Sequence, residues 1–98
     1  MRRLVVREQA EIEIAAAIDW YQRQNPVAAQ NFATAVEHVL KAIQENPFHY
    51  QVIEAKIRRA VMSTFPYRLI YLVTDTDVAV VSCLHTSRDP EAWRDLGR

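Results

Sequence analysis

The chain has 98 residues, half of them hydrophobic, and its twelve basic and twelve acidic side chains give a formal net charge of zero. This length allows one modest hydrophobic core, so residues 1–98 are expected to form a single domain. The balanced charge argues against a protein that grips nucleic acid by phosphate neutralisation alone, and the lack of long apolar runs argues against a membrane span. Cys83 is the one cysteine, which excludes an internal disulfide and suits a cytoplasmic location.

The N-terminal half predicts one strand followed by two helices. Residues 3–7 (RLVVR) combine β-branched residues with flanking arginines, which is typical of an edge strand. Residues 8–24 repeat apolar side chains at three- and four-residue spacing, which predicts an amphipathic helix. Asn25 can cap a second helix through its side-chain oxygen, Pro26 suits the first helical position, and Pro47 ends that helix. Because the link between them is very short, the two helices are expected to form an antiparallel hairpin.

The C-terminal half predicts three consecutive strands, at residues 57–63, 67–74 and 77–85, joined by two short turns. Both faces of the middle strand are largely apolar, with Arg68 as the exception, which indicates a central place in the sheet. Residues 48–56, between the second helix and the first of these strands, are expected to be a connector.

A short helix is predicted at the C-terminal end. Asp89 can cap it, Pro90 can occupy its first turn, and residues 91–96 would carry Trp93 toward the core. The element order is therefore β-α-α-β-β-β followed by a short C-terminal helix. Helices that precede a run of strands are typical of an α+β fold, here with the helical hairpin packed on one face of a mainly antiparallel sheet and the opposite face partly open.

Basic residues gather along the predicted strands. Because alternate residues share one face of a sheet, Arg68 and one of Arg58 or Arg59 could converge with His85. Such a cluster suits a phosphodiester, with His85 as an acid or base near neutral pH. The alternative is that Arg58 and Arg59 are solvated edge residues and that His85 only ends its strand. A one-residue change of register would exchange the faces of the two adjacent arginines.

Other residues that could carry chemistry have plainer interpretations. Trp20 and Tyr21 are expected to pack in the core. Asp75 and Asp77 are expected to form a turn and not a catalytic carboxylate pair. The three histidines and the cysteine match no metal-ligand spacing, and no glycine-rich loop is present for a nucleotide, so neither a metal nor another cofactor is expected.

Several segments resemble one family of bacterial proteins. They are the AAAIDWY segment that ends at Tyr21, the Asn-Pro pair after the second helix, the arginine pair, FPYRLIY at 65–71 and HTSRDPEAW at 85–93. Together they are similar to the RelE/ParE superfamily of toxins, often described as plasmid stabilisation proteins. The similarity covers nearly the whole chain in a compatible element order. FPYRLIY followed at this distance by His-x-x-Arg-Asp-Pro is more specific to the superfamily than to either of its branches.

The resemblance implies the toxin component of a bacterial type II toxin–antitoxin system, which inhibits growth and is neutralised by a cognate antitoxin protein. Antitoxins of this class bind through an extended, partly helical segment that wraps the toxin. The toxin alone is not expected to bind a specific DNA sequence or a membrane.

Two mechanisms divide the superfamily. In the RelE-like branch the resemblance implies a ribosome-dependent mRNA endonuclease (an mRNA interferase), whose catalytic residues here would be Arg68 and His85. In the ParE-like branch the toxin binds DNA gyrase and traps the cleaved complex, which requires no acid–base pair and makes the toxin a binding inhibitor. The neutral charge, the scarcity of lysine near the sheet and the Trp20-Tyr21 pair followed by an Asn-Pro cap favour the ParE-like branch.

Four residues are candidates for binding under either mechanism: Arg58, Arg59, Arg88 and Trp93. A third hypothesis is an inactive member of the superfamily. Growth arrest on expression without an antitoxin would reject that hypothesis.

Overall fold

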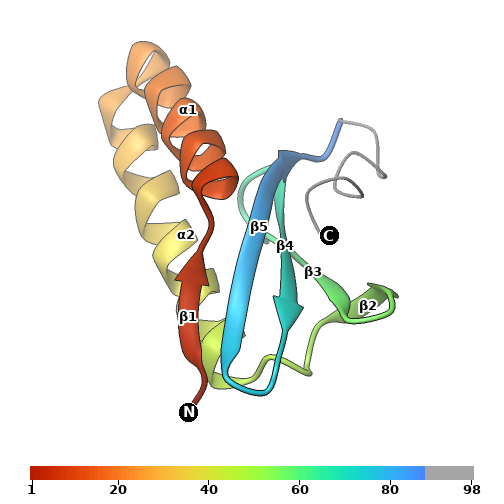
Figure 1. The fold of residues 1–98 in the computed structure, drawn as a ribbon. Helices are drawn as coiled ribbons and strands as arrows, with labels where there is room; N and C mark the ends of the chain where they lie inside the picture. Colours follow the sequence, from red (N-terminus) through yellow and green to blue (C-terminus); the bar gives the residue numbers. More distant parts are fainter. Residues whose placement is uncertain (88–98) are drawn as a thin grey trace.

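The computed structural model describes residues 1–87, which form two helices and a five-stranded sheet. The elements in chain order are β1 (Arg3–Val6), α1 (Glu8–Gln24), α2 (Pro26–Glu45), β2 (Gln51–Glu54), β3 (Ile57–Val61), β4 (Tyr67–Val73) and β5 (Asp77–His85). The two helices lie side by side and pack against one face of the sheet (Figure 1). This arrangement confirms the α+β fold and the helical hairpin. The predicted C-terminal helix lies outside the described residues.

Local sequence explains where the helices begin and end. Glu8 and Glu11 occupy the first turn of α1, where the helix dipole favours negative charge. The side-chain oxygen of Asn25 accepts a hydrogen bond of 2.9 Å from the backbone N–H of Val27, and Pro26 opens α2. Both predicted helix starts are therefore confirmed. Within the described residues, no helix is long and apolar enough to cross a membrane.

The strand order in the sheet is β1-β5-β4-β3-β2. β1 runs parallel to β5, with Arg3 opposite Asp77, and the other three pairs are antiparallel. β1 lies at an edge and β4 lies in the centre, as the sequence predicts. The chain therefore brings its first strand next to the last strand that the structure describes.

β2 was not expected, because it lies inside the stretch assigned to a connector. Val52 lies opposite Arg58 and Glu54 opposite Ile57, so the register shifts between the two pairs. Ala55, in the turn that follows, has a φ of 47°, in the left-handed region. The strand is short, mostly exposed and without an alternating apolar pattern, which is why its sequence gives no strand signal.

β5 contains a bulge in its middle. Ile70 lies opposite Ser82 and Tyr71 opposite Val80, so Val81 is an extra residue on the β5 side. Beyond the bulge the alternation of β5 is offset by one residue. Val80 and Cys83 consequently both pack with the helix-side core.

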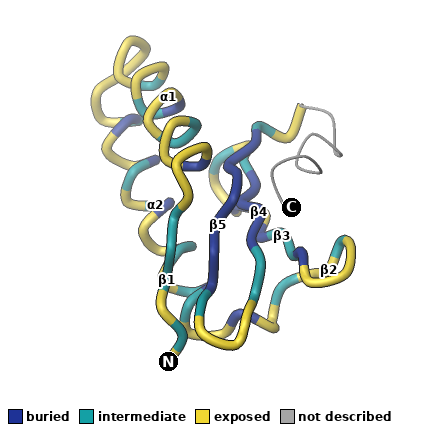
Figure 2. The backbone as a smooth tube through the Cα atoms, viewed as in Figure 1, coloured by how far each residue is buried: buried dark blue, intermediate teal, exposed yellow. Residues whose placement is uncertain are grey.

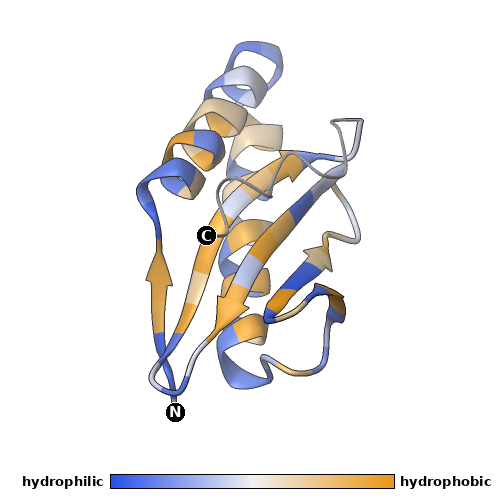
Figure 3. Cartoon of the chain, turned by 45° about the vertical axis from the view of Figure 1, so that its right-hand side comes forward, coloured by the Kyte–Doolittle hydropathy of each residue, from blue (hydrophilic) through white to orange (hydrophobic). Residues whose placement is uncertain are grey.

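Burial is concentrated in β4 and β5, and apolar residues follow both strands (Figures 2 and 3). The main core lies between the helices and the sheet; its largest fully buried members are Phe32, Ile43, Leu69 and Tyr71. A second cluster lies on the face away from the helices and contains Ile57, Ile70, Val81 and Leu84, each at most 7% exposed. The second face is therefore closed at these positions, whereas Val61 on the same face is 58% exposed.

Candidate functional site

Arg68 and His85 lie on opposite faces of the sheet. Arg68 is opposite Leu84, whereas its neighbour Tyr67 is opposite His85. Residues that face each other across an antiparallel pair share a face, and successive residues alternate. Arg68 consequently lies on the face away from the helices, and His85 lies on the helix side. The sheet does not bring the two candidate catalytic residues together.

Arg68 is buried within the sheet. It lies between Val61 on β3 and Leu84 on β5, and only 6% of it is exposed. An arginine with so little exposed surface belongs to the buried part of the second face. It is not displayed to solvent as a contact for a phosphodiester.

The two adjacent arginines of β3 have different partners. Arg58, opposite Tyr71, points to the helix side, where its Nη1 donates to the backbone oxygens of Phe48 at 3.2 Å and Tyr50 at 2.7 Å. Its guanidinium also lies over the Phe48 ring, 5.2 Å from the centroid. Arg59 shares the face of Arg68 and donates through Nε and Nη2 to the side-chain oxygen of Gln51. Arg58 therefore holds the connector, and Arg59 is the arginine of the pair on the face away from the helices.

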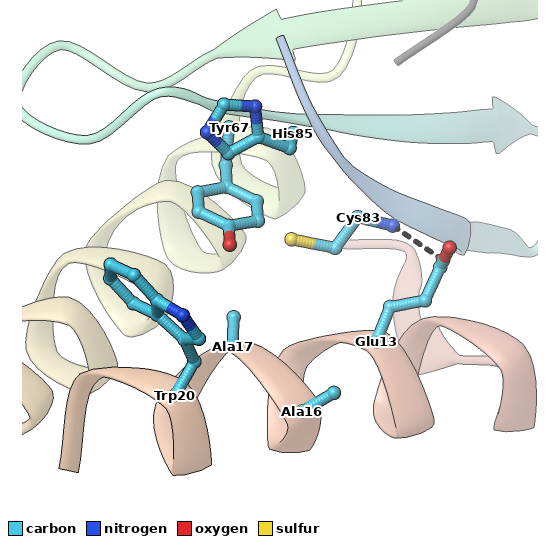
Figure 4. Close-up of a pocket in the computed structure, with 7 residues that line it drawn as sticks. All are labelled: Glu13, Ala16, Ala17, Trp20, Tyr67, Cys83 and His85. Carbon is cyan, nitrogen blue, oxygen red and sulfur yellow. Dashed lines mark hydrogen bonds between the residues drawn. The ribbon is translucent and has the colours of Figure 1, made fainter. Parts of the chain in front are cut away.

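A groove opens between α1 and the ends of β4 and β5 (Figure 4). It consists of two adjoining hollows of about 240 Å³ and 370 Å³ that share Trp20, Tyr67 and His85. We call it the Trp20 groove; its lining residues are Glu13, Ala16, Ala17, Trp20, Tyr21, Pro66, Tyr67, Cys83 and His85. Of the proposed arginines that the structure describes, Arg58, Arg59 and Arg68, none lines it.

The small residues of α1 make the groove possible. Ala16 and Ala17 leave the space between the helix and the sheet unfilled, and Trp20 rises one turn further along the same helix face. Trp20 is 55% exposed, so the prediction that it packs in the core is wrong. Tyr21 is only partly exposed and packs on Phe32, as the sequence predicts. The two neighbours differ because successive residues on a helix point about 100° apart.

The His85 ring is held by Ser87. Its Nδ1 accepts a hydrogen bond of 3.1 Å from the backbone N–H of Ser87, a group that can only donate, and the Ser87 hydroxyl lies 2.8 Å from the same nitrogen. In this arrangement Nδ1 is the hydrogen-bond acceptor of the ring, and Nε2 is the nitrogen that can donate. The ring packs edge-on against Tyr67, with 5.1 Å between the ring centroids. His85 therefore brings a hydrogen-bond donor to the groove.

Glu13 anchors the other end of the groove. Its Oε1 accepts hydrogen bonds from the Ser82 hydroxyl at 2.7 Å and from the backbone N–H of Cys83 at 3.0 Å. Burial, and then the negative charge of Glu13, raise the pKa of the Cys83 thiol to about 12. Burial is also the main reason that the pKa of Tyr67 is raised, with smaller contributions from Tyr21 and Cys83. Both groups stay protonated at neutral pH, which suits a binding groove better than a nucleophilic centre.

No cluster of three or more histidine, cysteine, aspartate or glutamate side chains that could hold a metal ion occurs in residues 1–87. Arg88 and Trp93, the remaining candidate binding residues, lie outside the described residues.

Comparison with known proteins identifies the family. A family model described as the ParE toxin of the type II toxin–antitoxin system, parDE, matches residues 4–90. The chain belongs to the ParE toxin family. A chain of the solved chromosomal ParDE toxin–antitoxin system from P. aeruginosa is 15% identical, with a TM-score of 0.77 over 87% of this chain and 96% of that chain. At this identity the structural similarity supports the fold alone. No curated protein matches the sequence.

The family match confirms the resemblance to the RelE/ParE superfamily and the preference for its ParE-like branch. The Trp20 groove of this ParE-family toxin was missed, although the sequence contains a signal for it. Glu13, Ala16, Ala17 and Trp20 are spaced i, i+3, i+4 and i+7, which puts them on one helix face. The spacing alone cannot reveal that a hollow remains between this helix face and the ends of β4 and β5.

Proposed function

We propose that this protein is a toxin that inhibits DNA gyrase in the cytoplasm and is neutralised by a cognate antitoxin, with residues 1–98 acting as one toxin domain. The observation that carries the proposal is the match of the ParE toxin model to residues 4–90. An inhibitor of this kind acts by binding a protein target and needs a surface that complements it, with no catalytic constellation.

The geometry of the sheet supports inhibition by binding over cleavage of RNA. Arg68 is buried on one face, and His85 lies on the other with its Nδ1 occupied by Ser87. An acid–base mechanism would require both groups within reach of one phosphodiester. The formal net charge of zero also suits a protein target better than a polyanion.

The proposal is tested by measuring gyrase and translation side by side with the same purified toxin. We expect loss of gyrase supercoiling and accumulation of cleaved DNA, while primer extension on translated mRNA reveals no toxin-dependent cuts. Cuts in ribosome-bound mRNA together with unimpaired gyrase would refute the proposal and support a ribonuclease.

A second experiment addresses neutralisation. Expression of the toxin alone should arrest growth, and coexpression of the antitoxin encoded beside its gene should restore growth. Normal growth on expression of the folded toxin alone would indicate an inactive member of the family.

A further inference from the structure

The Trp20 groove has the surface properties of a protein contact. Trp20 and Ile12 are each 55% exposed, and together with Ala16 they form an apolar stripe at i, i+4 and i+8 along α1. Exposed tryptophans beside a hollow are typical of residues that contribute strongly to protein–protein binding. The part of the groove lined by Ala16 and Ala17 holds about 240 Å³, which suits one long side chain of a partner.

The charge around the groove favours a cation. α1 carries four carboxylates and one arginine, and that arginine, Arg23, forms an ion pair of 2.7 Å with Asp19. Within the groove, the bonds to the Glu13 carboxylate that involve described residues both end on Oε1, so Oε2 can accept another donor. Among residues 1–87, no lysine or arginine lines either hollow.

The aromatic rings strengthen this preference. Trp20 and Tyr67 face the same space from opposite sides, with Glu13 at the far end of the groove (Figure 4). A ring face attracts a cation through its quadrupole, and the aliphatic stem of lysine or arginine packs well on apolar surface. Apolar walls that lead to a carboxylate therefore match a side chain with a long stem and a positive head.

We propose that the Trp20 groove is the docking site for a basic side chain, arginine or lysine, of the antitoxin. The stem lies between Trp20 and Tyr67 over Ala16 and Ala17, and the charged head reaches the Glu13 carboxylate. This inference rests on the proposed neutralisation by an antitoxin and adds the chemistry of the contact.

The test measures binding of the antitoxin encoded beside the toxin gene by calorimetry. Glu13→Gln removes the charge but keeps an oxygen for Ser82 and Cys83, so it should bind about tenfold more weakly with only a small loss of stability. Trp20→Ala should bind at least tenfold more weakly because one wall is lost. The matched controls are Glu11→Gln, on the same helix outside the groove, and Val27→Ala, a 63% exposed apolar residue elsewhere; both should bind as the wild type does.

A third groove variant controls for misfolding. Ala16 is exposed, so Ala16→Arg is compatible with the helix and places a competing cation in the groove. It should weaken antitoxin binding by more than tenfold, while its thermal melting stays close to that of the wild type.

A double-mutant cycle identifies the partner residue. Each basic residue of the antitoxin is changed to glutamine and combined with Glu13→Gln, and we expect one of them to show a coupling of about tenfold. Wild-type affinity in the Glu13, Ala16 and Trp20 variants, or no coupling with any basic residue, would overturn the inference while leaving neutralisation intact. Failure of the wild-type toxin to bind the antitoxin would overturn neutralisation, and this inference with it.

Discussion

The carboxylate of Glu13 on α1 accepts a hydrogen bond of 2.7 Å from the hydroxyl of Ser82 on β5, across 69 residues of sequence. The same oxygen accepts the backbone N–H of Cys83. The last residue pair between β1 and β5 joins Val6 and Val80, so β5 continues beyond the end of its pairing with β1. The Glu13 side chain of α1 thus supplies a hydrogen-bond acceptor to β5 beyond the end of β1.

Glu13→Ala should destabilise the fold. The change leaves the Ser82 hydroxyl and the Cys83 N–H without this acceptor, and we expect a loss of about 1–3 kcal/mol in the free energy of unfolding, measured by urea denaturation. Glu13→Gln, which keeps an acceptor, should lose much less. Glu11→Ala, at an exposed position of the same helix, should lie within about 0.5 kcal/mol of the wild type. Equal losses of stability for the alanine and glutamine variants would contradict the role of Glu13 as a hydrogen-bond acceptor at the edge of β5.

Arg58 and Arg59 should differ sharply in their effect on stability. Arg58→Ala removes two bonds to the connector carbonyls of Phe48 and Tyr50 and the packing on the Phe48 ring. We expect it to cost about 1–3 kcal/mol. Arg59→Ala loses only exposed bonds to Gln51 and should cost about 0.5 kcal/mol or less. Thermal melts of the two variants give the comparison, and similar melting temperatures would refute it.

Arg68→Ala should behave as a core substitution. Because Arg68 is 6% exposed in the central strand, the truncation leaves space between Val61 and Leu84 and should cost about 2–5 kcal/mol. Growth arrest by the variant should then decrease in proportion to the amount of folded protein, which is measured by circular dichroism and soluble yield. A variant that melts like the wild type but no longer arrests growth would instead give Arg68 a direct role in toxicity.

Tyr71 should make the fold sensitive to alkaline pH. Its hydroxyl donates to the Pro47 oxygen at 2.7 Å. Burial raises the pKa of this hydroxyl from 10.0 to about 12; nearby Arg58 acts to lower the pKa, and Tyr50 acts to raise it. The unfolded chain therefore loses this proton first, so the tyrosine's contribution is complete below pH 10 and declines between pH 10 and about 12, by on the order of 2 kcal/mol.

Tyr71→Phe provides the control for this pH dependence. At neutral pH it should be about 1–2 kcal/mol less stable because the Pro47 oxygen loses its donor. Its stability should then fall less steeply than that of the wild type between pH 10 and 12, in denaturant titrations at each pH. Parallel curves for the two proteins would rule out Tyr71 as a source of the slope.

The elements with strong local signals were predictable. The helical hairpin followed from apolar periodicity and from the Asn25-Pro26 cap, and the central place of β4 followed from its two apolar faces. β2 was not predictable because its pairing with β3 is irregular and its side chains are mostly exposed. Nothing in residues 51–54 alone separates such a strand from a connector.

The candidate site could not be predicted from sequence periodicity, because it depends on strand register and on a bulge. Arg68 and His85 belong to separate strands, and only the register of β4 against β5 decides that they point to opposite faces. The bulge at Val81 further offsets the outer half of β5, which a strict two-residue alternation cannot anticipate. Trp20 was misplaced for a related reason, because α1 presents alanines where a larger residue would have filled the space beneath it.

The parallel pairing of β1 with β5 sets the order in which the molecule can be completed. Arg3 and Asp77 are 74 residues apart, and their contact closes a loop that includes both helices and the other three strands. β1 is synthesised long before β5, so it has no partner strand in the sheet until synthesis has passed Val80. The nascent chain therefore cannot assemble the finished sheet before β5 has been made.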